Sequence, residues 1–90
     1  MVEKTVIVNN PLGIHARPAA LLVQMASKFQ AKIFLSKADI RGVNGKSIMS
    51  VMMLAAEKGA EVIVNAEGED ADRAVEALAE LLESNFEDKI

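Results

Sequence analysis

The only histidine of the 90-residue chain, His15, stands directly before a run of residues that favours a helix. Pro11 and Gly13 interrupt the preceding segment, and alanine, leucine and valine then recur at helical spacing. Pro18 falls in the first turn, where a missing N–H costs nothing because the first amides of a helix have no partner inside it. The remaining amides and the positive end of the helix dipole favour an anion. We therefore predict a site for a phosphoryl group around His15.

These residue types suit phosphoryl transfer. A phosphoryl acceptor must offer a lone pair, which a neutral imidazole ring provides. A helix start disfavours the cationic ring, so we expect His15 to be neutral and nucleophilic. Arg17 adds a permanent cation whose planar fork can pair with phosphate oxygens. The predicted phosphate-stabilising helix start is therefore Ala16, Arg17 and Pro18, while Gly13 leaves room for the backbone to approach.

Each of these residues also has an ordinary explanation. A single histidine is more often a surface or core residue than a nucleophile, and an arginine is more often part of a solvated face. Gly13 alone would be a turn residue and Pro18 a helix starter. Only their joint pattern favours the phosphoryl site.

Composition bounds the kind of protein. Ninety residues with 51% hydrophobic content predict one small domain, 1–90, whose core needs no covalent staples. The absence of cysteine excludes disulfides and thiolate metal sites and fits a reducing cytoplasm. One histidine without clustered carboxylates offers no adequate ligand set, so we expect no metal and no cofactor.

The charge argues for protein partners. A net charge of −3 disfavours nucleic acid and anionic membranes, and three phenylalanines without tryptophan or tyrosine give no platform for stacking bases. The chain shows neither a signal peptide nor an apolar run long enough to span a bilayer. We expect a cytoplasmic protein without membrane insertion.

The pattern along the chain predicts the elements that position His15. Strands are expected at 5–8, 31–36, 40–43 and 61–66, where β-branched or alternating residues lie between turn signals. Helices are expected at 16–28 and from Ile48 to a stop at Gly59. A third is expected from Asp70 or Asp72 onward, with an apolar stripe of Val75, Leu78 and Leu82 and fraying from Asn85. The order βαββαβα suits an α+β open-faced sandwich, with helices on one face of a small sheet.

The second predicted helix begins after Ser47 and is more apolar than a single buried stripe requires. Ile48, Val51, Met52 and Ala55 recur at helical spacing, and Met49 and Met53 add a second apolar side. Core filling and a docking surface for other proteins are equally compatible with this pattern. Ser47 itself is more simply a helix cap or a solvated hydroxyl than a modified residue.

Three segments carry a resemblance to a known family, and together they extend over essentially the whole chain. They are Pro-Leu-Gly-Ile-His-Ala-Arg-Pro-Ala-Ala at 11–20, Val-Asn-Gly-Lys-Ser-Ile-Met-Ser-Val-Met at 43–52 and Ala-Glu-Gly-Glu-Asp at 66–70. The chain resembles the histidine-containing phosphocarrier (HPr) family of the bacterial sugar phosphotransferase system. The resemblance implies a four-stranded antiparallel sheet covered by three helices. It also implies that His15 accepts a phosphoryl group on Nδ1 from phosphorylated Enzyme I, charged by phosphoenolpyruvate, and donates it to a sugar-specific Enzyme IIA.

The resemblance also gives roles to the second helix. It implies that Ile48, Met49 and Met52 dock partner proteins, and that Ser47 is a regulatory site for an HPr kinase/phosphorylase. A phosphate on Ser47 would weaken docking to an acidic phosphodonor and could recruit a basic partner, such as a catabolite repressor. A small carrier that meets successive partners through one face is most simply a monomer.

Some positions depart from the family pattern, and rival functions remain. Leu12 stands where the family often has a small or polar residue, Ala20 where some branches have threonine, and Ser50 where glycine is common. A nitrogen-type phosphotransferase carrier would use the same His15. An HPr-like catabolite-repression cofactor lacks the active histidine. A ligand- or RNA-binding α+β domain is the third alternative, disfavoured by the acidic balance.

Overall fold

The computed structural model describes residues 1–84, so the predicted fraying from Asn85 lies outside the described residues. Its elements follow the predicted order, which is confirmed. They are β1 (Val2–Ile7), α1 (Ala16–Ala26), β2 (Lys32–Lys37), β3 (Ile40–Asn44), α2 (Ile48–Met53), β4 (Glu61–Glu67) and α3 (Ala71–Glu83).

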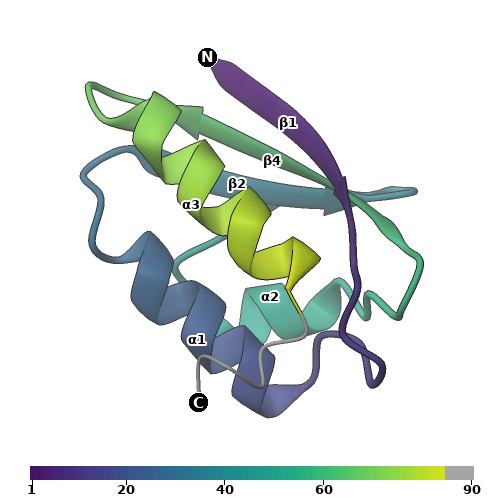
Figure 1. Cartoon of the computed structure of the whole chain (residues 1–90). Coiled ribbons are helices and arrows are strands. Elements are labelled where there is room, and N and C mark those ends of the chain that lie inside the picture. Colours follow the sequence, from purple (N-terminus) through teal and green to yellow (C-terminus); the bar gives the residue numbers. More distant parts are fainter. Residues whose placement is uncertain (85–90) are drawn as a thin grey trace.

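The four strands form one antiparallel sheet in the order β1-β4-β2-β3, and the three helices cover one face of it (Figure 1). The predicted α+β open-faced sandwich is therefore confirmed. In β4, Val62, Val64 and Ala66 are buried while the residues between them are at least partly exposed, as the alternation predicted. This alternation sets the register, since a slip by one residue would turn the buried valines to solvent.

The core lies between the sheet and the helices. The largest fully buried side chains come from every layer: Leu22, Ile33, Leu35, Leu54, Leu78, Leu82, Val8, Val51, Val62, Val64 and Val75. Leu22 lies on α1, Val51 on α2, and Leu78 on α3, so each helix contributes to the same core. The start of α1 is therefore held in place by the packing of this helix against α2 and α3 in the shared core.

The ends of several elements differ from prediction by a few residues. The first strand runs over Val2–Ile7 and not 5–8, and α1 ends at Ala26 and not at residue 28. The helix stops early because Lys28 and Phe29 donate their N–H groups three residues back, to Met25 and Ala26. Lys28, the last residue of the predicted helix, thus lies in a turn beyond the observed one.

The prediction that α2 extends to Gly59 was wrong. The helix ends at Met53, and Ala55 adopts the left-handed conformation, with φ of +50°. Lys37 Nζ donates to the Ala55 carbonyl at 3.1 Å, and the Ala56 carbonyl accepts the Ile14 N–H at 2.8 Å. These partners from elsewhere in the fold capture carbonyls that a longer helix would use internally. Gly59 instead lies in a turn before β4, where its N–H donates to Val8 O at 2.9 Å.

Asp70 precedes α3 but does not cap it with its side chain. The carboxylate instead accepts the N–H groups of Gln30 and Ala31, both at 2.9 Å. The bond from Gln30, assisted by Ala31 and Arg73, holds the pKa of Asp70 below its usual range. Asp70 therefore joins the loop after α1 to the start of α3.

Candidate functional site

His15 occupies the N-cap position of α1. Its backbone is extended, with φ −99° and ψ −163°, and its carbonyl accepts the Ala19 N–H at 2.9 Å. The imidazole ring is exposed and makes no capping hydrogen bond to the helix. No capping bond to the helix start therefore has to break before the ring can react.

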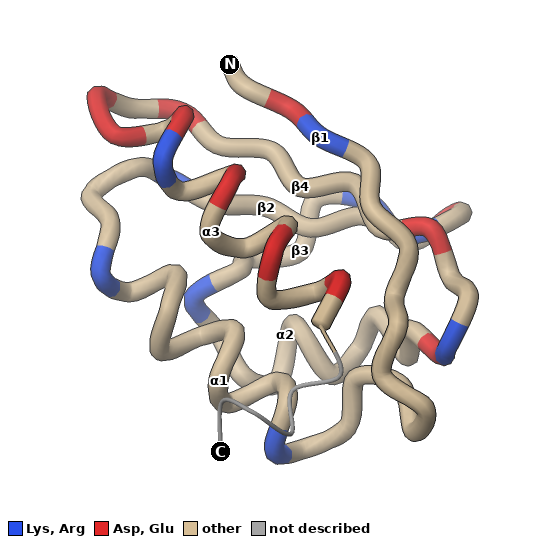
Figure 2. Tube along the Cα trace, viewed as in Figure 1, with Lys and Arg blue, Asp and Glu red and all other residues tan. Residues whose placement is uncertain are grey.

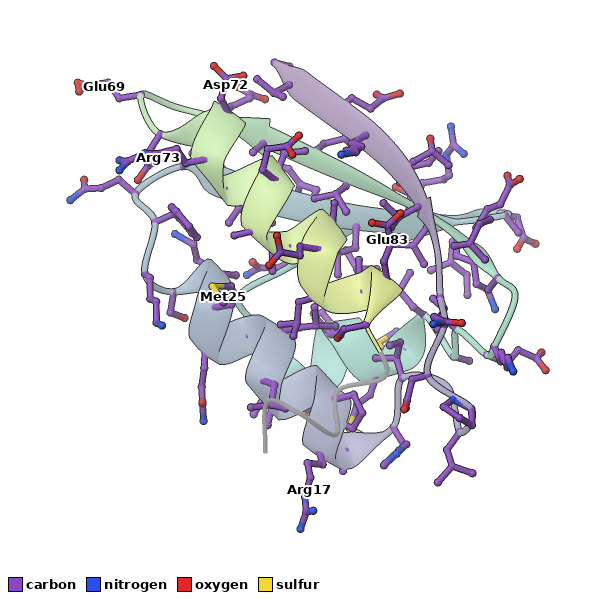
Figure 3. All side chains as sticks on the ribbon, in the orientation of Figure 1. Arg17, Met25, Glu69, Asp72, Arg73 and Glu83 are labelled. Carbon is purple, nitrogen blue, oxygen red and sulfur yellow. The ribbon has the colours of Figure 1, made fainter. Side chains whose placement is uncertain are left out.

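The first turn of α1 presents donors that the described part of the chain does not use. The N–H groups of Ala16 and Arg17 have no acceptor among residues 1–84, and Pro18, which is buried, has no N–H to leave unpaired. The Arg17 side chain is exposed, and Figure 3 shows it extending from the start of the helix away from the body of the domain. Ala16, Arg17 and His15 thus share one solvent-facing helix start, which favours an anion.

The loop before His15 is anchored by backbone bonds. Gly13 has φ of +73°, and a Cβ there would lie 2.6 Å from Ala56 O, so only glycine fits. Ile14, the next residue, is buried and donates its N–H to the same Ala56 carbonyl at 2.8 Å. We predicted that Gly13 leaves room for the backbone to approach. The structure shows a stricter requirement, because the missing side chain lets the loop lie against the chain that follows α2.

Asn10 is a site-loop residue that sequence reasoning missed. Its side chain is buried, and Nδ2 donates to Gly13 O at 2.6 Å, while the Gly13 N–H donates to Asn10 O at 2.9 Å. Asparagine close to a turn often bonds to backbone a few residues away, so the pair Asn10 and Gly13 was a detectable signal.

Helix α2 leaves most of its apolar side chains in solvent. Ile48, Met49, Met52 and Met53 are 44%, 78%, 42% and 67% exposed, whereas Val51 is fully buried. The predicted spacing of Ile48, Val51, Met52 and Ala55 is thus not a buried stripe, because only Val51 of these four enters the core and Ala55 lies beyond the helix. The exposed group forms an apolar surface on the short helix.

Ser47 is the N-cap of α2. Its Oγ accepts the Ser50 N–H at 3.3 Å, and its carbonyl accepts the Val51 N–H at 3.0 Å. The residue before it, Lys46, donates from Nζ to Phe29 O at 2.7 Å and so ties the entrance of α2 to the turn that follows α1. The capping role considered for Ser47 is therefore present, and the side chain remains partly exposed.

The acidic residues of the three helices all lie on α3. Helices α1 and α2 contain no acidic residue, whereas α3 carries Asp72, Glu76, Glu80 and Glu83, as Figure 2 shows. His15 and Arg17 therefore lie at the start of a helix that carries no carboxylate, and neither does α2, although the net charge of the protein is −3. Among residues 1–84 no three His, Cys, Asp or Glu side chains gather as a metal site.

The comparisons with known proteins define this chain as a small phosphocarrier domain and not a catalytic enzyme. The family model described as the PTS HPr component phosphorylation site matches residues 2–84. The phosphocarrier protein HPr of Treponema pallidum is 51% identical over 89 residues, which cover 99% of this chain and 100% of that protein. The chain therefore belongs to the HPr family of the phosphotransferase system.

Solved structures agree with this assignment. The crystal structure of HPr-C-His from Thermoanaerobacter tengcongensis aligns with a TM-score of 0.88 at 48% identity, covering 96% of both chains. A crystal structure of Crh, the Bacillus subtilis catabolite repression containing protein, aligns with a TM-score of 0.72 at 46% identity, covering 91% of this chain and 93% of that one. That Crh structure is described as a dimer with a swapping domain.

Across residues 1–84 we find no helix with the length and apolar character needed to cross a membrane.

Proposed function

We propose that His15 accepts a phosphoryl group from phosphorylated Enzyme I and passes it to a sugar-specific Enzyme IIA in the cytoplasm. The single observation that carries this proposal is the exposed imidazole at the N-cap of α1 beside the unused N–H groups of Ala16 and Arg17. In the transfer, the Nδ1 lone pair forms the new N–P bond as the bond between phosphorus and the donor breaks. Little further chemistry is required, because phosphoryl transfer depends mainly on alignment and charge compensation.

Arg17 and the helix start supply the charge compensation. Both amides and the guanidinium are free to bind phosphate oxygens without breaking an ion pair within residues 1–84. Such charge-assisted bonds are stronger than neutral ones and form only when phosphate is present. We therefore assign Arg17 to binding the transferred group, with Ala16 and Pro18 shaping the helix start.

The test is a labelling experiment with Enzyme I and radiolabelled phosphoenolpyruvate. Wild-type protein is expected to acquire label that is stable to base and labile to acid, as a phosphohistidine is. His15→Ala is expected to acquire none, and Arg17→Ala to be labelled more slowly. The matched control is Arg41→Ala in β3, whose guanidinium bonds to Ala38 O in the hairpin turn. Normal labelling of His15→Ala would remove the assignment.

The exposed face of α2 is the proposed docking surface, formed by Ile48, Met49 and Met52. Methionine suits it because a flexible, polarisable side chain can fit several partners in turn. Since α1 and α2 have no carboxylates and Arg17 is close to the site, the matching phosphodonor surface is acidic around an apolar centre. One face that serves donor and acceptor in succession is consistent with a monomer.

We also propose that Ser47 is a regulatory phosphorylation site for an HPr kinase/phosphorylase. Ser47 is partly exposed and directly precedes Ile48 of the proposed docking surface. A phosphate there would add a charge of about −1.5 to −2 and repel an acidic donor, while a basic partner such as a catabolite repressor would gain from it. Ser47→Asp is expected to slow His15 labelling at limiting donor without unfolding the protein, and unchanged kinetics would count against this regulation.

Two other functions share parts of this evidence. A catabolite-repression cofactor is favoured by the 46% identity to Crh, and the intact pair of His15 and Arg17 argues against it as the sole role. A nitrogen-type carrier would use the same helix start with other enzymes. Comparing labelling by a sugar-type and a nitrogen-type Enzyme I separates these carriers, and sedimentation at several concentrations separates a monomer from a swapped dimer like that of Crh.

A further inference from the structure

The polar group buried nearest to the proposed phosphoryl site belongs to Asn10, which is 7% exposed. Ser36 is the other buried polar residue between positions 1 and 84, and it serves the β2–β3 hairpin by accepting the Gly42 N–H at 2.8 Å. Within residues 1–84 the bonds of Asn10 join it to Gly13: Nδ2 donates to Gly13 O at 2.6 Å, and the Asn10 carbonyl accepts the Gly13 N–H at 2.9 Å. The two bonds close a small ring two residues before His15.

This ring occupies both backbone polar groups of the residue two positions before His15. Both polar groups of Gly13 are used by Asn10, and the Ile14 N–H is used by Ala56. The amides of Ala16 and Arg17 are left without an acceptor among residues 1–84. Carbonyl oxygens near a phosphoryl group repel it, whereas free N–H groups attract it. The Asn10 side chain therefore engages one carbonyl of the loop with a donor, while the helix start keeps its own donors free among residues 1–84.

The same ring fixes the path of the chain into the helix. Gly13 must hold φ of +73° with its Cα against Ala56 and Glu57. Glycine has no side chain that could stabilise this conformation. The bond from Asn10 Nδ2 supplies that restraint from a buried position, where a hydrogen bond is not weakened by exchange with water. His15 follows two residues later, so backbone motion at Gly13 would also move the imidazole ring of His15.

We propose that Asn10 is a positioning residue for phosphoryl transfer, acting through Gly13 on the placement of His15 and the first amides of α1. This inference rests on the proposed function. Asn10 touches neither the donor nor the phosphoryl group. Its contribution is to hold the ring nitrogen and the free amides in one arrangement before the donor arrives, so that no loop reordering is needed during transfer.

The sharpest variant is Asn10→Asp, which keeps the shape of the side chain but places an oxygen where the amide nitrogen donates to Gly13 O. Asn10→Ala removes the side chain altogether. The matched control is Asn65→Ala, because the Asn65 amide bonds to Glu3 Oε1 at 2.8 Å between β1 and β4, away from the site loop. All proteins are compared in single-turnover labelling by phosphorylated Enzyme I, over a range of donor concentrations and well below each melting temperature.

Both Asn10 variants are expected to lose about tenfold to a hundredfold in the maximal rate of labelling. The donor concentration that gives half of that rate should not change, because Ile48, Met49 and Met52 are untouched, and Asn65→Ala should match the wild type.

If the wild type itself is not labelled, the proposed function fails. If it is labelled and the folded Asn10 variants reach the same maximal rate, or lose only donor affinity, Asn10 has no positioning role. If Asn10→Ala does not fold, Asn10→Asp alone decides between these outcomes. If neither folds, the proposal that Asn10 acts on the site and not on the fold is rejected.

Discussion

Replacing Gly13 with alanine tests whether the site loop depends on close contact with the chain after α2. The added Cβ would lie 2.6 Å from Ala56 O and 2.9 Å from Glu57 Cα, and both of these are backbone atoms that cannot swing aside. The φ of +73° adds a conformational cost of about 1–2 kcal/mol for any L-residue. Overpacking adds about 1–3 kcal/mol when neighbours must shift. The expected loss in the free energy of unfolding is therefore about 2–5 kcal/mol.

Gly59 provides the matched control. It has φ of +90°, but an added Cβ would meet nothing within 4 Å. Gly59→Ala should therefore lose only the conformational part, about 1–2 kcal/mol. In a domain of this size each kcal/mol lowers the melting temperature by about 4–8 °C, so the two variants should be clearly separated.

The assay is urea unfolding of the wild type and both variants at neutral pH, with the slope m compared to confirm that the unfolded states are equivalent. Labelling of the folded Gly13→Ala variant should also slow, because the loop must move away from Ala56 to accept the methyl group. Equal losses for Gly13→Ala and Gly59→Ala would refute the argument that contact with Ala56 and Glu57, and not φ alone, requires glycine at the site.

Three further predictions follow from other parts of the fold. Val51→Ala, at the one buried position of α2, should cost about 1.5–3 kcal/mol in urea unfolding, whereas Met49→Ala should change stability by less than about 0.5 kcal/mol and should raise the donor concentration needed for labelling. Asp70→Asn should destabilise the protein at neutral pH. Since the folded pKa of Asp70 is lowered, its contribution is present above the unfolded value of about 3.9 and is lost as the pH falls through the folded value. The gap in urea midpoint between wild type and Asp70→Asn should therefore narrow below about pH 4, and a gap constant down to pH 2 would contradict the assignment. Ala55→Gly should stabilise the protein by about 0.5–1 kcal/mol in thermal unfolding, because it relieves the left-handed φ of +50°; a loss of stability would show that Ala55 is not strained.

Patterns local in sequence predicted much of this fold. The alternation of Val62 and Val64 placed β4, and the apolar spacing of Val75, Leu78 and Leu82 placed α3. Both signals come from burial on one side of a single element, which leaves a period in the sequence. The position of His15 at a helix start was predicted in the same way, from breakers before it and a periodic run after it.

Features set by partners distant in sequence were not predictable. The early end of α2 depends on Lys37 and Ile14 reaching the carbonyls of Ala55 and Ala56, and nothing near Met53 in the sequence indicates this. Asp70 was expected at a helix start, but its carboxylate binds Gln30 and Ala31, 40 and 39 residues away. The strand order likewise depends on which edges meet, which periodicity does not encode.

The shortness of α2 bears on how readily it opens. It spans 6 residues and buries only Val51, whereas α3 spans 13 residues and buries most of its apolar stripe. So short a helix has few bonds of its own and depends on its cap and on one core contact. Its amide hydrogens should therefore exchange with deuterium sooner than those of α3, through local opening that leaves the sheet intact. If α2 is the docking surface proposed above, such local opening would let its exposed methionines adapt to different partners, while His15 stays at the start of the longer α1.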